Sequence, residues 1–399
     1  MAENAKASAG GRLRVVFLVR SLEVGGAERQ LAGLARGLDR ARFAVTVCCF
    51  YDAGRFAEEL RSAGVGIVPL EKRGRWDGPR FFRRLAAEMR ALRPHVVHSF
   101  LGPPNVAAAF VKPRLPGVRL VWGVRASNME LGRYDYSWRL TSALERFLSR
   151  RADVIAANSF AGRDHVVGMG YPPDRVVVVP NGIDVGRWRP DERGGRAVRA
   201  AWGVAPDEAL IGLVARLDPM KDHETFLRAA ALAAAGRPGL RFVCVGAGGG
   251  RDRDRLARLA AELGIADRVV WAGPRDDMAA VYSALDVHTS SSAYGEGFSN
   301  AVAEAMAAGV PCAVTDVGDS ARIVGDTGPV VPPGDPTALA DGWRRLLDLG
   351  RAERRRLGER CRRRIADTYS EARMIERMAA IYAGARDGTG GPETAPCAE

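Results

Sequence analysis

The sequence predicts an α/β protein with two doubly wound, parallel-sheet domains in tandem. Three observations support this fold class. First, the chain has 399 residues, more than one domain of common size requires. Second, short runs of Val, Ile and Leu alternate with longer stretches of helical apolar spacing, as in parallel sheets covered by helices on both faces. Third, residues 185–198 interrupt this alternation with polar sequence rich in Arg and Gly, after which it begins again.

Seven apolar runs in the first half are expected to form buried strands. They are Leu13–Val19, Ala44–Phe50, Val65–Leu70, His95–Ser99, Arg119–Gly123, Val154–Ala157 and Val176–Val179. The intervening stretches Ala27–Leu38, Pro79–Leu92 and Trp138–Arg150 have the spacing of amphipathic helices. We therefore expect a first Rossmann-like domain over residues 12–190, preceded by a disordered tail at residues 1–11.

Six further runs are expected to form the second sheet. They are Ala209–Ala215, Leu240–Val245, Val269–Trp271, Val287–Thr289, Cys312–Thr315 and Val330–Val331. The second Rossmann-like domain is expected over residues 191–369, followed by an amphipathic helix at Ser370–Ala383 and a disordered tail at residues 386–399. Ligands of such folds bind at the carboxyl ends of the strands, so two facing sheets would place a cleft between the domains.

Positive charge is concentrated in the first half of the chain. The net charge is +12; residues 1–190 contain 31 Lys and Arg against 17 Asp and Glu, whereas residues 191–399 contain 28 against 30. This asymmetry favours contact with a phospholipid surface, a lipid-phosphate acceptor or nucleic acid. A solvated, Arg-rich surface explains it equally well.

The composition also indicates in which cellular compartment the protein is expected. None of the six Cys residues forms a Cys-x-x-Cys pair, and three of them lie in or beside buried runs, which favours a reducing compartment. No run approaches the roughly 20 apolar residues of a membrane-spanning helix. We therefore expect a cytoplasmic protein whose contact with the inner face of the cytoplasmic membrane, if made, is peripheral.

The strongest functional signal is the segment 296–300, of sequence EGFSN, followed by Glu304. Ser299 and Asn300 are both good N-cap residues, which places Glu296 in a loop and Glu304 on the helix after it. The two carboxylates would then lie about 12 Å apart and could hold different ends of an elongated ligand. Gly297 would let the backbone approach closely, and free N–H groups at the helix start would face a diphosphate.

A second signal follows the expected strand Ala209–Ala215. Arg216 and Lys221 would project from the strand end and from the start of the next helix. Two fixed cations are what a leaving diphosphate requires, because its negative charge grows as the glycosidic bond breaks. A surface ion pair between Arg216 and Asp218 is the simpler alternative.

Two glycine-containing turns are weaker signals by themselves. Gly25 and Gly26 separate the first strand from its helix and would let the backbone approach a phosphate or a sugar. Residues 181–184, of sequence NGID, mark a tight turn before the second domain.

Together the four segments resemble the retaining nucleotide-sugar glycosyltransferases of glycosyltransferase family 4, which have the GT-B fold. That family carries a Gly-Gly-x-Glu loop, an Asn-Gly-(Val/Ile)-Asp turn, an Arg…Lys pair and a Glu-x7-Glu element. All four occur here in that order, within residues 13–385. The resemblance implies a retaining hexosyltransferase with the acceptor on the first domain and the nucleotide-sugar on the second. It also implies that the helix at 370–385 packs back on the first domain.

The resemblance implies a role for each matching position. Glu296 would hold the donor-sugar hydroxyls, and Arg216 and Lys221 would bind the diphosphate; these three are the expected catalytic residues. Glu304 would bind the ribose, and the strand end from Trp271 onward would meet the nucleobase. The complete donor site would comprise Gly25, Gly26, Arg216, Lys221, Gly273, Arg275, Glu296, Gly297, Phe298, Ser299, Asn300 and Glu304.

The acceptor side departs from the family pattern. Many members carry a His at the end of a first-domain strand, whereas Arg125 stands there in this chain. His98, at the end of another strand, and Asn128 are the other acceptor-side residues, although a strand-end His whose hydrogen bonds are satisfied within the protein is an equally good explanation of His98. The family's Gly-Gly-x-x-Glu is replaced by residues 318–322, of sequence GDSAR, so no acidic contact is carried over.

Three other interpretations have less support. Residues 252–254, of sequence DRD, match a metal-binding Asp-x-Asp but lie in an alternating charge run typical of a solvated helix, so neither a metal nor a cofactor is expected. A GT-B sugar-nucleotide epimerase would use the same donor site without an acceptor. A nucleic-acid-binding protein would explain the basic first half, but no nucleic-acid motif accompanies it.

We therefore expect transfer of a hexose or N-acetylhexosamine from a nucleotide-sugar, with UDP favoured over GDP or ADP. The expected acceptor is a glycan or a lipid-linked saccharide, and the bacterial-looking composition indicates cell-surface polysaccharide or lipopolysaccharide synthesis. The basic first domain would contact an anionic membrane, and nucleic acid is not an expected partner.

Overall fold

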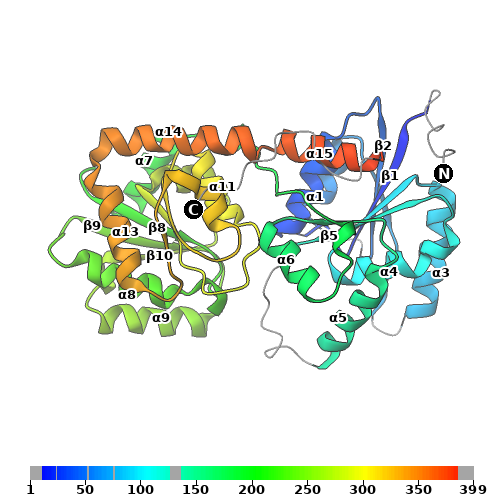
Figure 1. Ribbon diagram of the computed structural model, residues 1–399. Helices are drawn as coiled ribbons and strands as arrows, with labels where there is room; N and C mark the ends of the chain where they lie inside the picture. The colour runs from blue at the N-terminus through cyan, green and yellow to red at the C-terminus, as the bar shows by residue number, and fades with distance from the viewer. Residues whose placement is uncertain (1–10, 24, 52–53, 75–76, 126–135, 385–399) are drawn as a thin grey trace. The chain divides into compact units, whose positions relative to one another are not determined.

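Two parallel β-sheets organise the protein, shown by a computed structural model that describes residues 11–384 except Val24 and residues 52–53, 75–76 and 126–135. One unit comprises the described residues up to Gly182 and those from Glu371 onward, and the other runs from Ile183 to Ser370. The predicted fold class is confirmed, because each unit is a parallel sheet flanked by helices (Figure 1). Apart from residue 11, the expected tails lie outside the described residues, as does Asn128.

The first sheet has seven strands in the order β3-β2-β1-β4-β5-β6-β7. Its strands are β1 Leu13–Val19, β2 Phe43–Cys49, β3 Gly66–Pro69, β4 Val96–Phe100, β5 Arg119–Val124, β6 Val154–Ala157 and β7 Val176–Val178. Its helices are α1 Gly26–Gly37, α2 Phe56–Ser62, α3 Gly78–Leu92, α4 Gly102–Val111, α5 Tyr136–Ser149, α6 Phe160–Gly168 and α15 Glu371–Tyr382. The direction of strand progression reverses between β1 and β4, which makes this pair the topological switch point.

The end of the chain completes the core of the first unit. Met378 and Ile381 of α15 are buried with Leu31 of α1 and Phe17 of β1 in one hydrophobic cluster. Figure 1 shows α15 beside α1, on one face of the sheet. The opposite face is covered by a second cluster that includes Phe81 of α3. Helix α15 is therefore a structural part of this unit, because its apolar residues cover β1.

The second sheet has six strands in the order β10-β9-β8-β11-β12-β13. Its strands are β8 Ala209–Val214, β9 Leu240–Val245, β10 Val269–Gly273, β11 Val287–Ser290, β12 Cys312–Thr315 and β13 Val330–Val331. Its helices are α7 Glu192–Ala201, α8 His223–Ala234, α9 Gly250–Glu262, α10 Met278–Ala284, α11 Asn300–Ala307, α12 Ser320–Val324, α13 Pro336–Asp348 and α14 Gly350–Thr368. The switch point of this sheet is the pair β8 and β11.

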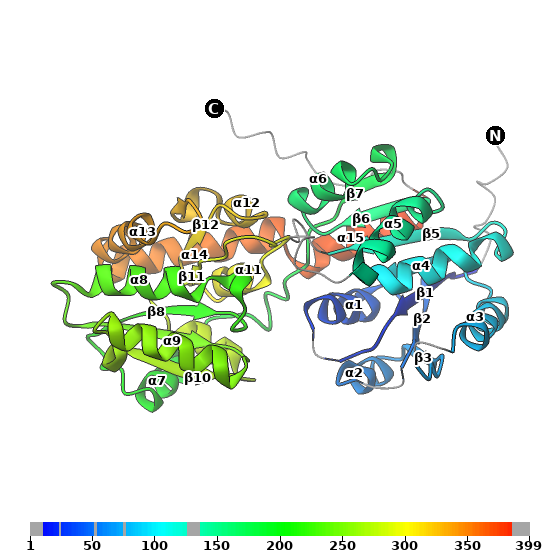
Figure 2. The ribbon, with the colours of Figure 1, turned by 90° about the horizontal axis from the view of Figure 1, so that it is seen from below.

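Two hydrophobic clusters enclose the second sheet as well. One contains Phe226 of α8, Leu256 of α9 and Trp343 of α13, and the view from below in Figure 2 looks onto these three helices. The other contains Val302 of α11 and Ile365 of α14 on the opposite face. Each sheet is thus buried on both faces, and for this reason its strands appear in the sequence as continuous apolar runs.

Residues 185–191 form turns and irregular chain, but residues 192–198 of the polar interruption belong to helix α7, which the sequence does not predict. The chain enters the second unit at Ile183, and Asp191 caps α7 by accepting a hydrogen bond from the Gly194 N–H at 2.9 Å. Gly194 and Gly195 weaken the helical pattern in sequence. Gly195 is nevertheless required by packing, because a Cβ there would lie 2.6 Å from the Ser283 carbonyl oxygen of the neighbouring α10. The two glycines indicate close helix packing rather than a loop.

Candidate active site

The switch point of the second sheet brings together two of the predicted segments. Strand β8 pairs with β11 in the register Ile211 to Val287 and Leu213 to Thr289, so their carboxyl ends lie side by side. The short 3₁₀ helix η4, Pro219–Lys221, follows β8, and the loop that contains Glu296 follows β11. In sheets of this topology the space outside these strand ends is where ligands bind.

Lys221 and Glu296 form an ion pair at this position. The Lys221 ammonium donates a hydrogen bond to Oε1 of Glu296, and the Ser292 hydroxyl donates to the same oxygen at 2.7 Å. The Glu296 side chain is only 8% exposed, so the pair is largely shielded from water. The Ser291 hydroxyl also donates to the Lys221 carbonyl at 2.9 Å, which ties η4 to the β11 loop. Both charged groups are therefore held in place before any ligand binds.

Two Asp residues shape the turn that carries Lys221. Asp218 accepts a hydrogen bond from the Met220 N–H at 3.0 Å and caps η4. Asp222 adopts φ 46°, in the left-handed region, and its carboxylate accepts from the Thr225 N–H at 3.0 Å to cap α8. Asp tolerates this conformation better than most side chains do. The two caps fix the backbone on either side of Lys221.

Glu304 lies on α11, as the sequence predicts, whereas Glu296 lies in the preceding loop. Ser299 is the N-cap residue of α11, and Asn300 is its first helical residue. The Glu304 side chain is buried, and its Oε2 accepts a hydrogen bond from the Tyr282 hydroxyl at 3.0 Å. Tyr282, on α10, was not recognised in the sequence; no local pattern relates it to a carboxylate on another helix.

The loop after β12 packs against the Glu296 segment. Gly318 has φ 64°, and a Cβ there would lie 2.5 Å from the Glu296 carbonyl oxygen and 2.7 Å from that of Gly297. The Asp319 N–H donates to the Gly297 carbonyl at 2.9 Å. The sequence offered no acidic contact at residues 318–322, and the structure gives this loop a supporting role through its backbone. Phe298 is buried and its ring lies 5.4 Å from that of Tyr369.

The remaining predicted donor-site residues of this unit follow β8 and β10, at the same edge of the sheet. Arg216 is 71% exposed and pairs with Asp218 at 3.7 Å, the surface pair that we gave as the alternative. Arg275 donates to both carboxylate oxygens of Asp277, at 2.8 and 2.5 Å, and this hydrogen bonding raises the pKa of Arg275. Gly273 ends β10 with φ 67°. The structure thus holds Lys221 in a largely buried ion pair and leaves the Arg216 side chain exposed at the same edge of the sheet.

In the first unit, Gly25 and Gly26 lie at the start of α1, the helix that follows the switch-point strand β1 along the chain. Gly25 is the N-cap residue and Gly26 the first helical residue. The neighbouring Gln30 side chain is buried and makes two hydrogen bonds to Gly182, donating to its carbonyl at 2.9 Å and accepting from its N–H at 2.8 Å. The glycine loop and the NGID turn are thus joined by one side chain.

His98 is enclosed rather than presented to a substrate. Its Nδ1 lies 2.6 Å from the hydroxyl of Tyr382 on α15, and only 1% of the residue is exposed. Burial holds the pKa of His98 well below its usual range, so the ring is neutral. The structure therefore favours a buried His that is hydrogen-bonded within the protein over the acceptor-side role expected of His98.

Arg125 follows β5 and is held by the other predicted turn. Its Nη1 donates to the Asn181 side chain at 2.5 Å, and its guanidinium lies 4.6 Å from the centre of the Phe100 ring. Burial lowers the pKa of Arg125 to about 10, so the group keeps its positive charge at neutral pH. A fixed cation therefore stands near the carboxyl end of β5.

Within the described part of the chain, no three His, Cys, Asp or Glu side chains gather in a way that could hold a metal ion. No helix among these residues is long and apolar enough to cross a membrane. The five described Cys residues are buried thiols, and burial raises the pKa of Cys361 to about 11.

The fold of this chain is similar to that of several proteins of known structure. The fold resembles that of Anabaena Alr3699/HepE in complex with UDP (TM-score 0.81, 20% identity, 94% of this chain and 100% of that one). It also resembles WaaG, a glycosyltransferase involved in lipopolysaccharide biosynthesis (TM-score 0.68, 17% identity, 93% and 100%). Two Rossmann-like units of this kind define the GT-B architecture.

The sequence comparisons identify the family. A model described as Glycosyltransferase Family 4 matches residues 24–187, and one described as Glycosyl transferases group 1 matches residues 208–349. The chain therefore belongs to glycosyltransferase family 4 (group 1), as its motifs predict.

Curated relatives include two D-inositol 3-phosphate glycosyltransferases. That of Nocardia farcinica is 35% identical over 269 residues, which are 63% of this chain and 58% of the relative. That of Mycobacterium tuberculosis (strain H37Ra) is 34% identical over 239 residues, 58% of this chain and 48% of the relative. The chain thus spans about half the length of the curated relatives it matches.

Proposed function

We propose that this protein is a retaining hexosyltransferase that uses a UDP-sugar. The donor would bind outside the carboxyl ends of β8 and β11, with its diphosphate at Lys221 and the start of α11. The observation that carries this proposal is the Lys221–Glu296 ion pair, built at the switch point of the sheet and largely shielded from water. The UDP bound to the structurally similar Alr3699/HepE supports the choice of nucleotide.

The geometry of the ion pair suggests which part of the donor each of its two groups, Glu296 and Lys221, would bind. Oε1 of Glu296 already accepts from Lys221 and Ser292, which leaves Oε2 to accept a hydrogen bond from a donor-sugar hydroxyl. The Lys221 ammonium has two further N–H donors for the diphosphate. Arg216, which is exposed beside it, would turn from Asp218 to the same group. Cations at this point stabilise the charge that develops on the leaving diphosphate.

In the proposed reaction the acceptor hydroxyl attacks the anomeric carbon from the face that the leaving diphosphate vacates. The bond from the anomeric carbon to the phosphate oxygen breaks as the new glycosidic bond forms. The acceptor proton passes to the departing phosphate oxygen, so no separate base is needed. This route retains the anomeric configuration, and it requires no metal because Lys221, Arg216 and the α11 N–H groups face the diphosphate.

A transfer assay tests this function directly. UDP-glucose, UDP-galactose and UDP-N-acetylglucosamine would be offered with EDTA and a panel of acceptors, and the product linkage would be determined by NMR. The proposal expects an α-linked product from an α-linked donor. A β-linked product would exclude retention, and conversion of the nucleotide-sugar without an acceptor would favour the epimerase.

The acceptor has two candidate classes. A glycan or lipid-linked saccharide of cell-surface polysaccharide fits the basic first half of the chain. A phosphorylated inositol is favoured by the names of the curated relatives. Arg125 is a fixed cation that could meet the phosphate of either acceptor. Competition between inositol 3-phosphate and a lipid-linked saccharide in the transfer assay would separate the two.

Contact with an anionic membrane would use a basic and aromatic patch on the first unit. A hollow of about 360 Å³ there is lined by Arg83 and Arg90 of α3, Arg114, and the rings of Phe82 and Phe110. The two rings lie 5.6 Å apart, and Phe110 is 41% exposed. Each such cation contributes about 1 kcal/mol at an anionic surface, and an exposed ring adds apolar contact.

Vesicle sedimentation tests this contact. Binding to phosphatidylglycerol vesicles should exceed binding to phosphatidylcholine vesicles and should fall with salt. The variant Arg83→Glu/Arg90→Glu should lose binding, whereas the control Arg253→Glu/Arg258→Glu, on exposed positions of α9, should keep it. Equal binding of both variants would remove the patch from the proposal.

A further inference from the structure

The second unit contains a pocket at the edge of its sheet opposite the candidate active site. Asp286, which lines it, directly precedes β11, and Pro311 directly precedes β12. The pocket therefore lies at the amino ends of these strands, whereas Lys221 and Glu296 follow the carboxyl ends. Its volume is about 650 Å³, within the range of small-molecule sites.

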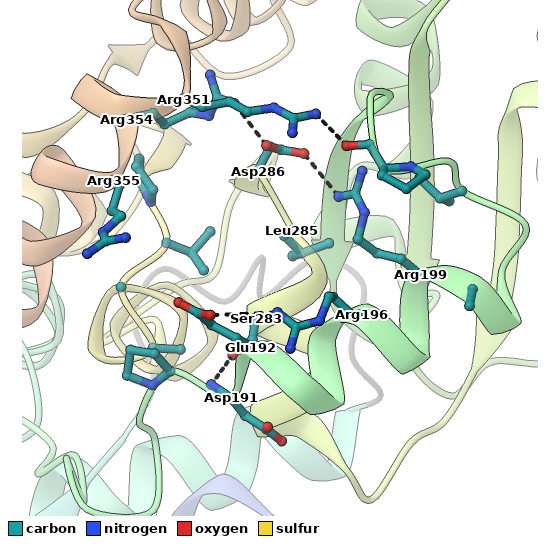
Figure 3. A pocket seen from close by; sticks show the side chains of 18 residues that line it. Asp191, Glu192, Arg196, Arg199, Ser283, Leu285, Asp286, Arg351, Arg354 and Arg355 are labelled. Carbon is teal, nitrogen blue, oxygen red and sulfur yellow. Dashed lines mark hydrogen bonds and ion pairs between the residues drawn. The ribbon is translucent and has the colours of Figure 1, made fainter.

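One carboxylate deep in this pocket is fully neutralised. Asp286 accepts from Arg354 at 2.9 Å and from Arg199 at 3.1 Å, and Figure 3 shows it between the two. Arg199 also donates to the Ala284 carbonyl at 2.8 Å, and Arg354 is almost completely buried. These three residues form a structural network, because each charge is paired and hydrogen-bonded.

Two other arginines of the pocket are paired only weakly. Arg196 of α7 lies 3.6 Å from Glu192, and Arg355 of α14 lies 3.6 Å from Glu359. Both side chains are more than 70% exposed, so these pairs are worth little. Figure 3 shows that they come from different walls of the pocket. Both guanidiniums are therefore available to an anion that enters.

The floor between these walls is apolar. Leu285 and Val310 are buried residues that line the pocket, together with Val204 and Ala308, which are also buried. The lining as a whole holds five Arg and three Asp or Glu residues, an excess of two positive charges. A phosphate monoester carries about −1.5 to −2 at neutral pH, and the planar guanidinium matches its oxygens.

We propose that this pocket is a second ligand site, which binds a phosphate monoester with an apolar body. The phosphate would meet Arg196 and Arg355, and the apolar body would cover Leu285 and Val310. The site is independent of the proposed donor site, since the two lie at opposite edges of one sheet. Ala308 and Val310 follow α11, whose first turn belongs to the donor site, so the two sites also share a helix.

Calorimetric titration of the full chain with 1-naphthyl phosphate tests this site. Saturating UDP would be present throughout, so that the probe does not enter the donor site. The proposal expects saturable binding of one probe molecule. Inorganic phosphate, which lacks the apolar body, and 2-naphthol, which lacks the charge, should each bind at least about tenfold more weakly.

Matched variants localise the binding. Arg196→Gln/Arg355→Gln should weaken the affinity for 1-naphthyl phosphate at least about tenfold. Arg193→Gln/Arg356→Gln removes the same charge from exposed positions of the same two helices, outside the pocket lining, and should change the affinity less than about twofold. Absence of saturable binding, equal losses in the two variants, or equal binding of inorganic phosphate or 2-naphthol would overturn the proposal.

Discussion

The two sheets share one strand order, yet their switch points are built for different purposes. In the second unit the strand ends lead into a charged pair, Lys221 and Glu296, supported by Ser292. In the first unit the fourth strand carries His98, which is sealed beneath Tyr382 of the returning helix α15. The topology of each sheet therefore determines where a site can form. The residues at the strand ends determine whether a substrate can reach that position.

A second contrast concerns two buried histidines on equivalent strands. His98 lies on β4 and His288 on β11, each the strand just across the switch point of its sheet. His98 has Tyr382 as a partner, whereas neither ring nitrogen of His288 has a hydrogen-bond partner within the described structure. Both are kept neutral by burial, but only one is stabilised by a hydrogen bond.

The largest effect is expected from Lys221→Ala. Removal of the ammonium should lower kcat by about 10²–10³-fold, because the charge that develops on the diphosphate loses its fixed cation. Steady-state release of UDP measures this loss. Lys112→Ala is the matched control, since Lys112 is buried to a similar extent and pairs with Asp153 at 2.6 Å in the first unit. Near-normal turnover of Lys221→Ala would remove Lys221 from the catalytic assignment.

The two carboxylates should separate sugar transfer from nucleotide binding. Glu296→Gln should lower kcat by about 10–100-fold and leave the Kd of UDP within about threefold, because the proposed ligand of its Oε2 is the donor sugar and not the nucleotide. Glu304→Gln should instead weaken UDP binding by about tenfold, because it removes a charge-assisted acceptor for the ribose. Kinetics and calorimetry on both variants measure these effects. If each variant lost transfer and UDP affinity to the same degree, the division of roles would be wrong.

The unpaired histidine should make stability sensitive to acid. Burial lowers the pKa of His288 to about 3, so below its unfolded value of 6.5 the unfolded chain binds a proton that the folded protein does not. The contribution of His288 to the free energy of unfolding is therefore complete above pH 6.5 and is lost as the pH falls. Between pH 7 and pH 5 this residue lowers the free energy of unfolding by up to about 2 kcal/mol. His288→Leu should lose that much less over the same interval, as measured by urea unfolding. A loss that matched the wild type would contradict this reasoning.

The smallest effect is expected from Tyr382→Phe in the first unit. Loss of the hydrogen bond to His98 should lower the free energy of unfolding by about 1 kcal/mol and change kcat by less than about twofold. Chemical unfolding and the transfer assay measure the two quantities. A large loss of activity at unchanged stability would show that Tyr382 belongs to a substrate site.

Much of this fold could be predicted from the sequence, because parallel strands that are buried on both faces consist of continuous apolar runs. Helix α7 was not predicted because Gly194 and Gly195 disfavour a helix, and they are explained by close contacts, of Gly194 with Asp191 and Ala280 and of Gly195 with Ser283. The place of Lys221 and Glu296 at one sheet edge also followed from their positions after strands.

Other parts of the site could not be predicted from local sequence. The family resemblance predicts that the helix at 370–385 packs on the first domain, but Tyr382 and His98 are separated by 284 positions and no sequence pattern pairs them. The bond from Tyr282 to Glu304 and the support that Gly318 gives to Glu296 likewise depend on how separate elements pack. Motifs locate charged groups along the chain, whereas their partners are set by tertiary structure.

Calorimetric titration of the protein with UDP, GDP and ADP, each in the presence of EDTA, tests the donor site most directly. We expect UDP to bind without metal and Lys221→Ala to weaken this binding. If none of the three nucleotides bound, the assignment of Lys221, Arg216 and Glu304 to a donor site in the second unit would be contradicted.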